Sequence, residues 1–165
     1  TDRFLRMLLE AVGCEYRFIA LRDLEIRPCD GCESCSKRFS CHIEDGMSLI
    51  YEEFKRADVI AVASPVYFGG ISGQLKQMMD RTLCLYYGKQ LKNKIGAALA
   101  TMGLDGGDLV LEAIDRFFQY HQIIYAGGVF GRGGIEKDVI EKDEGAEERV
   151  KSLGERIREL YKIRS

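Results

Sequence analysis

The sequence predicts an α/β protein in which helices cover both faces of a doubly wound parallel sheet. Amphipathic helical patterns alternate with short apolar runs from start to finish, and most of these runs are unbroken enough to be strands buried on both faces. Right-handed crossovers between parallel strands place the intervening helices on both sides of the sheet. With 165 residues, 46% of them apolar, residues 1–165 are expected to form one domain.

The helices are recognised by apolar residues that recur every three or four positions, and the strands by short runs of apolar or β-forming residues. We expect helices at 2–12, 47–57, 71–87, 108–120 and 138–165. We expect strands at 15–21, 58–63, 94–101 and 122–126. Gly13 is a natural stop for the first helix, and the glycines from Gly127 to Gly134 predict a long loop.

Charge and hydropathy exclude some classes of protein. The 24 Lys and Arg residues and 26 Asp and Glu residues leave a net charge of −2, which argues against a nucleic-acid binder that relies on bulk positive charge. The longest apolar stretches are far below the roughly 20 residues of a membrane span. The opening Thr1-Asp2-Arg3 belongs to a polar helical pattern rather than to a signal peptide. We therefore expect a cytoplasmic protein with no nucleic-acid or membrane partner.

Four of the six cysteines share the spacing C-x2-C-x2-C-x5-C inside a loop at 28–46. They are Cys29, Cys32, Cys35 and Cys41. Disulfides are disfavoured because a chain with a full core does not need them. Structural zinc usually takes two separated pairs of cysteines, whereas three cysteines at successive steps of three are typical of iron–sulfur sites. A [4Fe–4S] cluster is the favoured interpretation, and zinc or metal-free thiols stay open.

The remaining cysteines and the nearby histidine predict no chemistry. Cys14 and Cys84 lie on or beside apolar elements, so both are expected to be small buried residues. His42 follows Cys41 and is interpreted as an ordinary surface side chain.

Two glycine-containing turns follow neighbouring strands and suit a flat cofactor. In the turn 64–70, Pro65 fixes φ, while Tyr67 and Phe68 present aromatic rings where a core aromatic would be out of place. The turn 101–107 contains glycines that let the backbone approach a ligand closely. Because functional loops lie at the carboxyl ends of parallel strands, we expect 28–46, 64–70 and 101–107 at one edge of the sheet.

The order of these motifs resembles the iron–sulfur flavoprotein family, which belongs to the NAD(P)H-dependent FMN reductases with a flavodoxin-like fold. The motifs are Cys29-x2-Cys32-x2-Cys35-x5-Cys41, Glu44-Asp45-Gly46-Met47, Ala57-Asp58, Ser64-Pro65-Val66-Tyr67-Phe68 and Gly73-x-Leu75-Lys76-x3-Asp80-Arg81. The resemblance covers nearly the whole chain. It implies a flavodoxin-like three-layer sandwich that holds FMN and a [4Fe–4S] cluster.

The resemblance also assigns residues to sites. The residues expected to bind FMN are Thr1, Ser64, Pro65, Val66, Tyr67, Phe68, Gly69, Thr101, Met102, Gly103, Gly106 and Gly107. Thr1 would lie at a helix N-terminus near the phosphate, where free N–H groups favour an anion. Asp80 and Arg81 are interpreted as a structural pair that orients their helix. We expect no catalytic side chain, because the flavin carries the chemistry.

The sequence departs from the family pattern in two places. Asp45-Gly46 stands where two acidic residues are usual, which is a minor difference. The family's first strand and its phosphate-binding turn have no counterpart here, so the chain lacks a strand that would be central in the order 2-1-3-4-5. Without that strand, the strands 15–21 and 58–63 would each have an unpaired buried edge, which a folded domain does not tolerate. We therefore expect roughly 10–25 further residues before Thr1 in the native chain.

The expected function is electron transfer by an FMN-containing iron–sulfur flavoprotein. Its electron donor would be a redox partner such as a ferredoxin-like protein or NAD(P)H. The long loop 28–46 would reach a neighbouring subunit in a homodimer or homotetramer. The alternatives are a cluster-free NAD(P)H-dependent FMN or quinone reductase and, in another class, a non-enzymatic interaction module stabilised by zinc.

Overall fold

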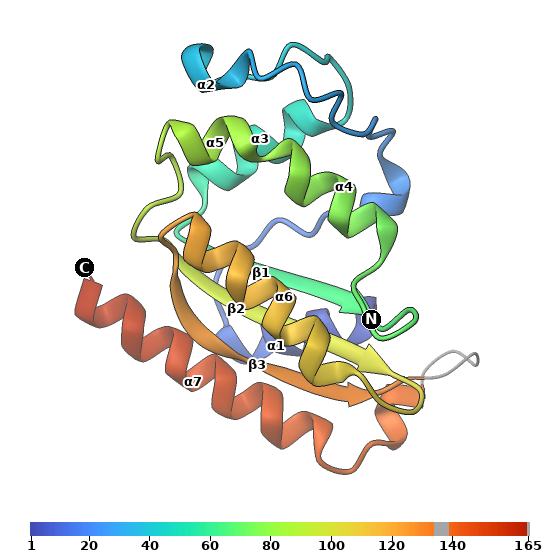
Figure 1. Ribbon diagram of the computed structural model, residues 1–165. Coiled ribbons are helices and arrows are strands. Elements are labelled where there is room, and N and C mark those ends of the chain that lie inside the picture. Colours follow the sequence, from blue (N-terminus) through green and yellow to red (C-terminus); the bar gives the residue numbers. More distant parts are fainter. Residues whose placement is uncertain (134–138, 165) are drawn as a thin grey trace.

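A parallel three-stranded sheet forms the centre of the computed structural model, which describes residues 1–133 and 139–164 (Figure 1). The strands are β1 (Val59–Pro65), β2 (Ile95–Met102) and β3 (Ile124–Arg132), in the order β1-β2-β3. Ile95 lies opposite Val59 on one side and opposite Ile124 on the other. The parallel sheet and its crossover helices confirm the predicted α/β class.

Helices cover both faces of the sheet and produce two hydrophobic cores (Figure 1). On one face lie α1 (Asp2–Val12) and α7 (Ala146–Arg164). On the other lie α3 (Met47–Arg56), α4 (Gly73–Arg81), α5 (Leu83–Tyr87) and α6 (Gly107–Tyr120). The short helical segments are α2 (Cys35–Arg38), η1 (Leu21–Asp23) and η2 (Val139–Lys142). Helix, sheet and helix are the three expected layers.

Local sequence signals explain where the helices begin and end. Gly13 adopts φ +69° after α1 and donates its N–H to the Leu9 carbonyl, as expected of a C-terminal glycine. Ser72 precedes α4, and its Oγ accepts the Leu75 N–H at 3.3 Å. The expected single helix at 71–87 is wrong, because the chain breaks at Thr82 and continues as the separate helix α5.

The last strand and the last helix differ from the expectation. The glycines read as a loop are partly strand, because β3 continues to Arg132. A Cβ at Gly131 would collide with Ile140, so glycine suits the close packing on this strand. The expected helix at 138–165 is η2 followed by α7. Gly134, Asp138 and Ser165 lie outside the described residues.

The expected strand at 15–21 is absent from the described structure. Residues 15–20 have no strand pairing, and β1 pairs with β2 alone. A cavity of about 1940 Å³ is lined on one side by 14–22 and on another by 58–63. Without a neighbouring ladder the backbone at 15–20 cannot pair, which explains the wrong expectation. The strand expected ahead of Thr1 is not among these residues and stays a prediction.

Two expectations about burial also need correction. Buried and half-buried residues alternate along β1, which was expected to be buried on both faces. The open cavity beside this strand explains the difference. Cys14 is exposed, contrary to expectation, whereas Cys84 is buried as expected. In the part of the chain that the structure describes, no helix is both long and apolar enough to cross a membrane.

Candidate cofactor sites

The turn after β1 presents an aromatic side chain in a strained backbone conformation. The N–H of Tyr67 donates to the Gly70 carbonyl at 2.9 Å, and the N–H of Gly70 donates to the Tyr67 carbonyl at 3.0 Å. The two residues between them, Phe68 and Gly69, have φ values of +51° and +75°. Glycine adopts this conformation freely, but phenylalanine rarely does. The Phe68 side chain is fully exposed, so no packing in the described chain explains its position.

Ser64 lies behind this turn rather than on its surface. It is fully buried, its hydroxyl donates to the Pro65 carbonyl at 2.8 Å, and its Oγ accepts the Ser72 N–H at 3.0 Å. The end of β1 is thereby tied to the start of α4. Among the residues expected to bind FMN, Ser64 therefore supports the turn, whereas Tyr67 and Phe68 are exposed.

The turns 64–70 and 101–107 meet at the carboxyl edge of the sheet, as predicted. The Val66 N–H donates to the Thr101 carbonyl at 2.9 Å. Gly106 has φ +81°, and a Cβ there would lie 3.1 Å from Val66 Cγ1 and 3.2 Å from Gly69 Cα. A side chain at this position would force the two turns apart. Gly107 then begins α6.

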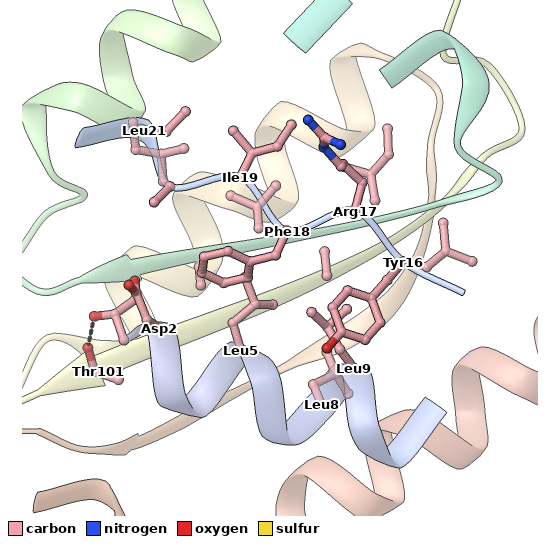
Figure 2. A pocket seen from close by; sticks show the side chains of 18 of the residues that line it. Asp2, Leu5, Leu8, Leu9, Tyr16, Arg17, Phe18, Ile19, Leu21 and Thr101 are labelled. Atoms are coloured by element: carbon pink, nitrogen blue, oxygen red, sulfur yellow. Dashed lines mark hydrogen bonds between the residues drawn. The ribbon is translucent and has the colours of Figure 1, made fainter. Parts of the chain in front are cut away.

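Thr1 and Thr101 come together beside these turns, although they are 100 positions apart. Their hydroxyl oxygens lie 2.5 Å apart at the N-terminus of α1. Figure 2 shows Thr101 beside Asp2, the first residue of α1. Thr1 and Thr101, together with Tyr67, Met102 and Gly103, line the end of the large cavity that also contacts α1 and 14–22. The first turn of a helix has unpaired N–H groups and attracts anions. The predicted phosphate position and the two predicted turns therefore share one cavity.

The cysteine loop lies elsewhere, so the expectation that all three loops share one edge is wrong. Its helix α2 lies beside α5, and the Gln90 side chain donates to the Phe39 carbonyl at 3.3 Å. Helix α4 starts at the carboxyl edge and runs back along the sheet, and its C-terminus lies beside the cysteine loop (Figure 1). The loop is held at this distant end of α4.

All four cysteines of the predicted cluster motif line one small cavity of about 50 Å³. Its lining contains Cys29, Cys32, Cys35 and Cys41, together with Asp80, Arg81 and Cys84. The cysteine loop forms one side of this cavity. The last residues of α4 and the first residues of α5 form the other side. Burial raises the pKa of the Cys35 and Cys84 thiols. The fold therefore brings the spaced cysteines together and adds a fifth thiol that the sequence analysis assigned to the core.

Among the described residues, no three cysteine sulfurs lie within 4.8 Å of one another. The one described group of three potential ligand atoms within this distance is Asp30, Cys32 and His42, which contains one cysteine. Tetrahedral zinc with bonds of about 2.3 Å would need its thiolates about 3.8 Å apart. A cubane cluster takes each thiolate on a different iron and so needs a wider set. His42 lies on the surface, as expected, with its Nε2 2.8 Å from Asp30 Oδ2.

Arg81 joins the two ends of the cysteine loop. Its Nη1 donates to the Arg27 carbonyl and to Asp45 Oδ2, both at 2.7 Å. Its Nη2 donates to the Ile43 carbonyl at 3.0 Å and to Asp45 Oδ1 at 3.2 Å. One guanidinium thus joins the backbone before Cys29 to the backbone after Cys41. The Arg81 side chain is fully buried, and that of Asp45 is 4% exposed.

Asp45 and Arg81 each stabilise the ionised form of the other. Burial would raise the pKa of Asp45, but hydrogen bonds from Arg81 and from the N–H groups of Arg27 and Met47 outweigh it and lower the pKa to about 2. The interpretation of Asp80 and Arg81 as a pair is therefore wrong. Asp80 pairs with Lys76 one turn earlier at 2.6 Å, while Arg81 faces the loop. The sequence gives no signal for this pairing, because Asp45 and Arg81 are far apart in the chain.

Comparison with known proteins identifies the family of this chain. Residues 1–136 match the family model described as NADPH-dependent FMN reductase, and the chain belongs to this family. An iron–sulfur flavoprotein of Methanocaldococcus jannaschii is 38% identical in an alignment that covers 99% of this chain and 91% of that protein. The predicted family resemblance is thus confirmed.

Solved structures confirm the flavodoxin-like fold. The Trp repressor binding protein of Bacillus subtilis aligns with a TM-score of 0.68 at 21% identity, covering 92% of this chain and 89% of that one. An archaeal flavodoxin aligns with a TM-score of 0.57 at 16% identity, covering 98% and 93%. At these identities the likeness concerns the fold alone.

Proposed function

We propose that this chain is an electron-transfer flavoprotein that binds FMN at the carboxyl edge of its sheet and a [4Fe–4S] cluster in its cysteine loop. The observation that carries the proposal is the convergence of all four spaced cysteines on one cavity. The relative from Methanocaldococcus jannaschii, named an iron–sulfur flavoprotein, supports it. A flavin exchanges electrons in pairs or singly, and a cluster exchanges them singly.

The carboxyl edge of the sheet fits FMN. The N-terminus of α1, with the Thr1 and Thr101 hydroxyls beside it, supplies donors for a phosphate. The turn 65–69 supplies an exposed aromatic ring at Phe68 and a tight backbone for one side of the flavin ring. The turn 101–107 flanks the ring from the next strand, and Gly106 keeps the two turns in contact. These residues bind and orient the flavin, and none needs to exchange a proton.

The cysteine loop fits a cluster by the chemistry of its donors. Four thiols within 13 positions line one cavity, and no three of these described sulfurs lie within 4.8 Å of one another. Thiols must lose their protons to bind iron, so the burial that raises the pKa of Cys35 favours the protonated thiol while no metal is bound. The free thiols also suit the reducing conditions of the cytoplasm, which we propose as the location.

The two proposed sites lie at opposite ends of α4 within one chain. Helix α4 separates them, and its nine residues span about 14 Å. Phe39, Tyr86 and Tyr87, in α5 and beside α2, are exposed near the cysteine loop and offer an apolar surface for a second copy. We therefore propose a homodimer or homotetramer in which the cluster of one subunit approaches the flavin of another. A monomeric mass of the cofactor-loaded protein in light scattering would contradict this arrangement.

Iron and acid-labile sulfide analysis of anaerobically purified protein tests the cluster. We expect about four irons and four sulfides per chain, and loss of both with retained FMN in Cys32→Ser. The matched control is Cys14→Ser, because Cys14 is exposed and does not line the small cavity of the cysteine loop. Iron retained in Cys32→Ser would refute the ligand assignment.

The same preparation distinguishes the alternatives. A flavin spectrum without iron would favour a cluster-free NAD(P)H-dependent FMN or quinone reductase, and zinc without flavin would favour an interaction module. Anaerobic addition of NADH, NADPH or a reduced ferredoxin-like protein identifies the donor by bleaching of the flavin absorbance. We expect at least one of these donors to reduce the protein, and a protein that stays oxidised with all three would contradict the proposed role.

A further inference from the structure

Arg81 has one donor that its role in closing the cysteine loop does not use. Four of the five N–H bonds of a guanidinium are accounted for by the Arg27 and Ile43 carbonyls and by the two Asp45 oxygens. The fifth, on Nε, is buried and has no hydrogen-bond partner among the described residues. A buried donor without an acceptor costs about 1–3 kcal/mol. Such a group calls for an explanation, and an absent ligand is one of the few available.

The surroundings of this donor contain sulfur. Arg81 lines the same small cavity as the four predicted cluster ligands, and it is the one described arginine that does so. Burial lowers the pKa of Arg81, but Asp45 and, more weakly, Cys41 raise it, and the net shift is upward. Cys41 lines the same cavity as Arg81, and it lies two residues before Ile43, whose carbonyl accepts a hydrogen bond from Arg81. A neutral thiol accepts hydrogen bonds weakly, whereas a metal-bound thiolate is a charged acceptor.

We infer that the Arg81 Nε–H donates a hydrogen bond to the Cys41 thiolate when the cluster is bound. This inference rests on the cluster of the proposed function and adds a residue outside the cysteine motif to the site. The four other donors of Arg81 hold its guanidinium in one orientation, so the Nε–H is directed before the cluster binds. Arg81 is in this sense a positioning residue that also acts on the electronic state of the cluster.

The hydrogen bond has a measurable consequence. A donor to a ligand sulfur stabilises the more negative, reduced form of a cluster, and hydrogen bonds to sulfur are a recognised means of setting the potential. Arg81→Lys keeps the positive charge and can still reach carbonyl oxygens, but lysine has no donor at the Nε position. We expect the reduced form to lose about tenfold in relative stability, which corresponds to about 59 mV for a one-electron couple.

The first experiment is a redox titration of the anaerobic holoprotein, monitored by EPR of the reduced cluster. We expect a more negative cluster potential in Arg81→Lys. The matched control is Arg27→Lys, because the Arg27 side chain is 58% exposed and lies outside the cavity. Equal potentials in the wild type and Arg81→Lys, with iron content retained, would show that Arg81 only supports the fold and would overturn the inference.

A second experiment does not depend on the stability of the variant. The wild-type protein is labelled with ¹⁵N-arginine, its cluster is reduced, and pulsed EPR is used to search for a ¹⁵N coupling. We expect a coupling from one arginine nitrogen, and its absence would overturn the inference. A wild type without iron would instead refute the cluster itself, so the two failures are distinguishable.

Discussion

Phe68 offers the sharpest test of how stability and cofactor binding are balanced in this protein. Its φ of +51° lies in the left-handed region, which costs roughly 1–2 kcal/mol for a residue with a Cβ. The two-residue turn formed by Phe68 and Gly69 has positive φ at both positions, and such turns favour Asn-Gly. The Phe68 side chain is fully exposed, so its removal forfeits no packing in the described chain.

We therefore expect Phe68→Asn to stabilise the cofactor-free protein by about 1 kcal/mol and to weaken FMN binding. Loss of one aromatic contact is worth about 1 kcal/mol, which raises the Kd for FMN about fivefold. Urea denaturation of the cofactor-free protein measures the first effect, and quenching of flavin fluorescence measures the second. The structure thus predicts effects of opposite sign on stability and binding.

Gln122 supplies a matched control for this experiment. It is also exposed with a positive φ, +58°, but it precedes β3 at the amino edge of the sheet, away from the turn 64–70. Gln122→Asn should relieve comparable backbone strain and leave the FMN affinity unchanged. An unchanged FMN affinity in Phe68→Asn would refute the role of Phe68 at the flavin, and a less stable Phe68→Asn protein would refute the strain argument.

Two further predictions concern stability. Burial lowers the pKa of His121 to about 4, against about 6.5 in the unfolded chain. The unfolded chain therefore binds the proton first as the pH falls, and about 3 kcal/mol of stability present above pH 6.5 is lost by pH 4. Urea midpoints across this range should show a weaker pH dependence in His121→Gln but an unchanged one in the exposed His42→Gln, and equal slopes in both would contradict the assignment. Gly46→Ala should destabilise by about 1–3 kcal/mol, because its Cβ would lie 2.9 Å from the Glu25 backbone carbonyl oxygen. Gly73→Ala meets open space and should be neutral or slightly stabilising, so similar thermal midpoints for the two alanine variants would argue against this packing.

Local patterns in the sequence were sufficient to predict much of the fold. The helix at 2–12 and its stop at Gly13 follow from apolar spacing and one glycine, which are local properties. The expected strand at 15–21 failed because a strand requires a partner, and local residues carry no information about whether one is available. The glycines of β3 were expected to form a loop, but several of them lie in the strand. Gly131 fits there because Ile140 packs closely against it.

In the candidate sites, too, local sequence predicted some features, whereas others depend on tertiary structure. The cysteine spacing and the two turns after neighbouring strands predicted which residues belong together, because each motif is continuous in the chain and its chemistry depends on residue type. The separation of the cysteine loop from the turns could not be predicted, since it depends on the direction of α4 and on where its last residue meets the loop.

The sequence by itself determined the fold class and the family and predicted which residues form the two cofactor sites, because periodicity and motif spacing are properties of consecutive residues. The tertiary structure alone decided that Thr1 meets Thr101 and that Arg81 joins both ends of the cysteine loop and Asp45. Such contacts join residues distant in the chain, and they form only when packed helices and strands bring those residues within hydrogen-bond distance. A buried guanidinium with one unused donor is visible only when every neighbour is in place.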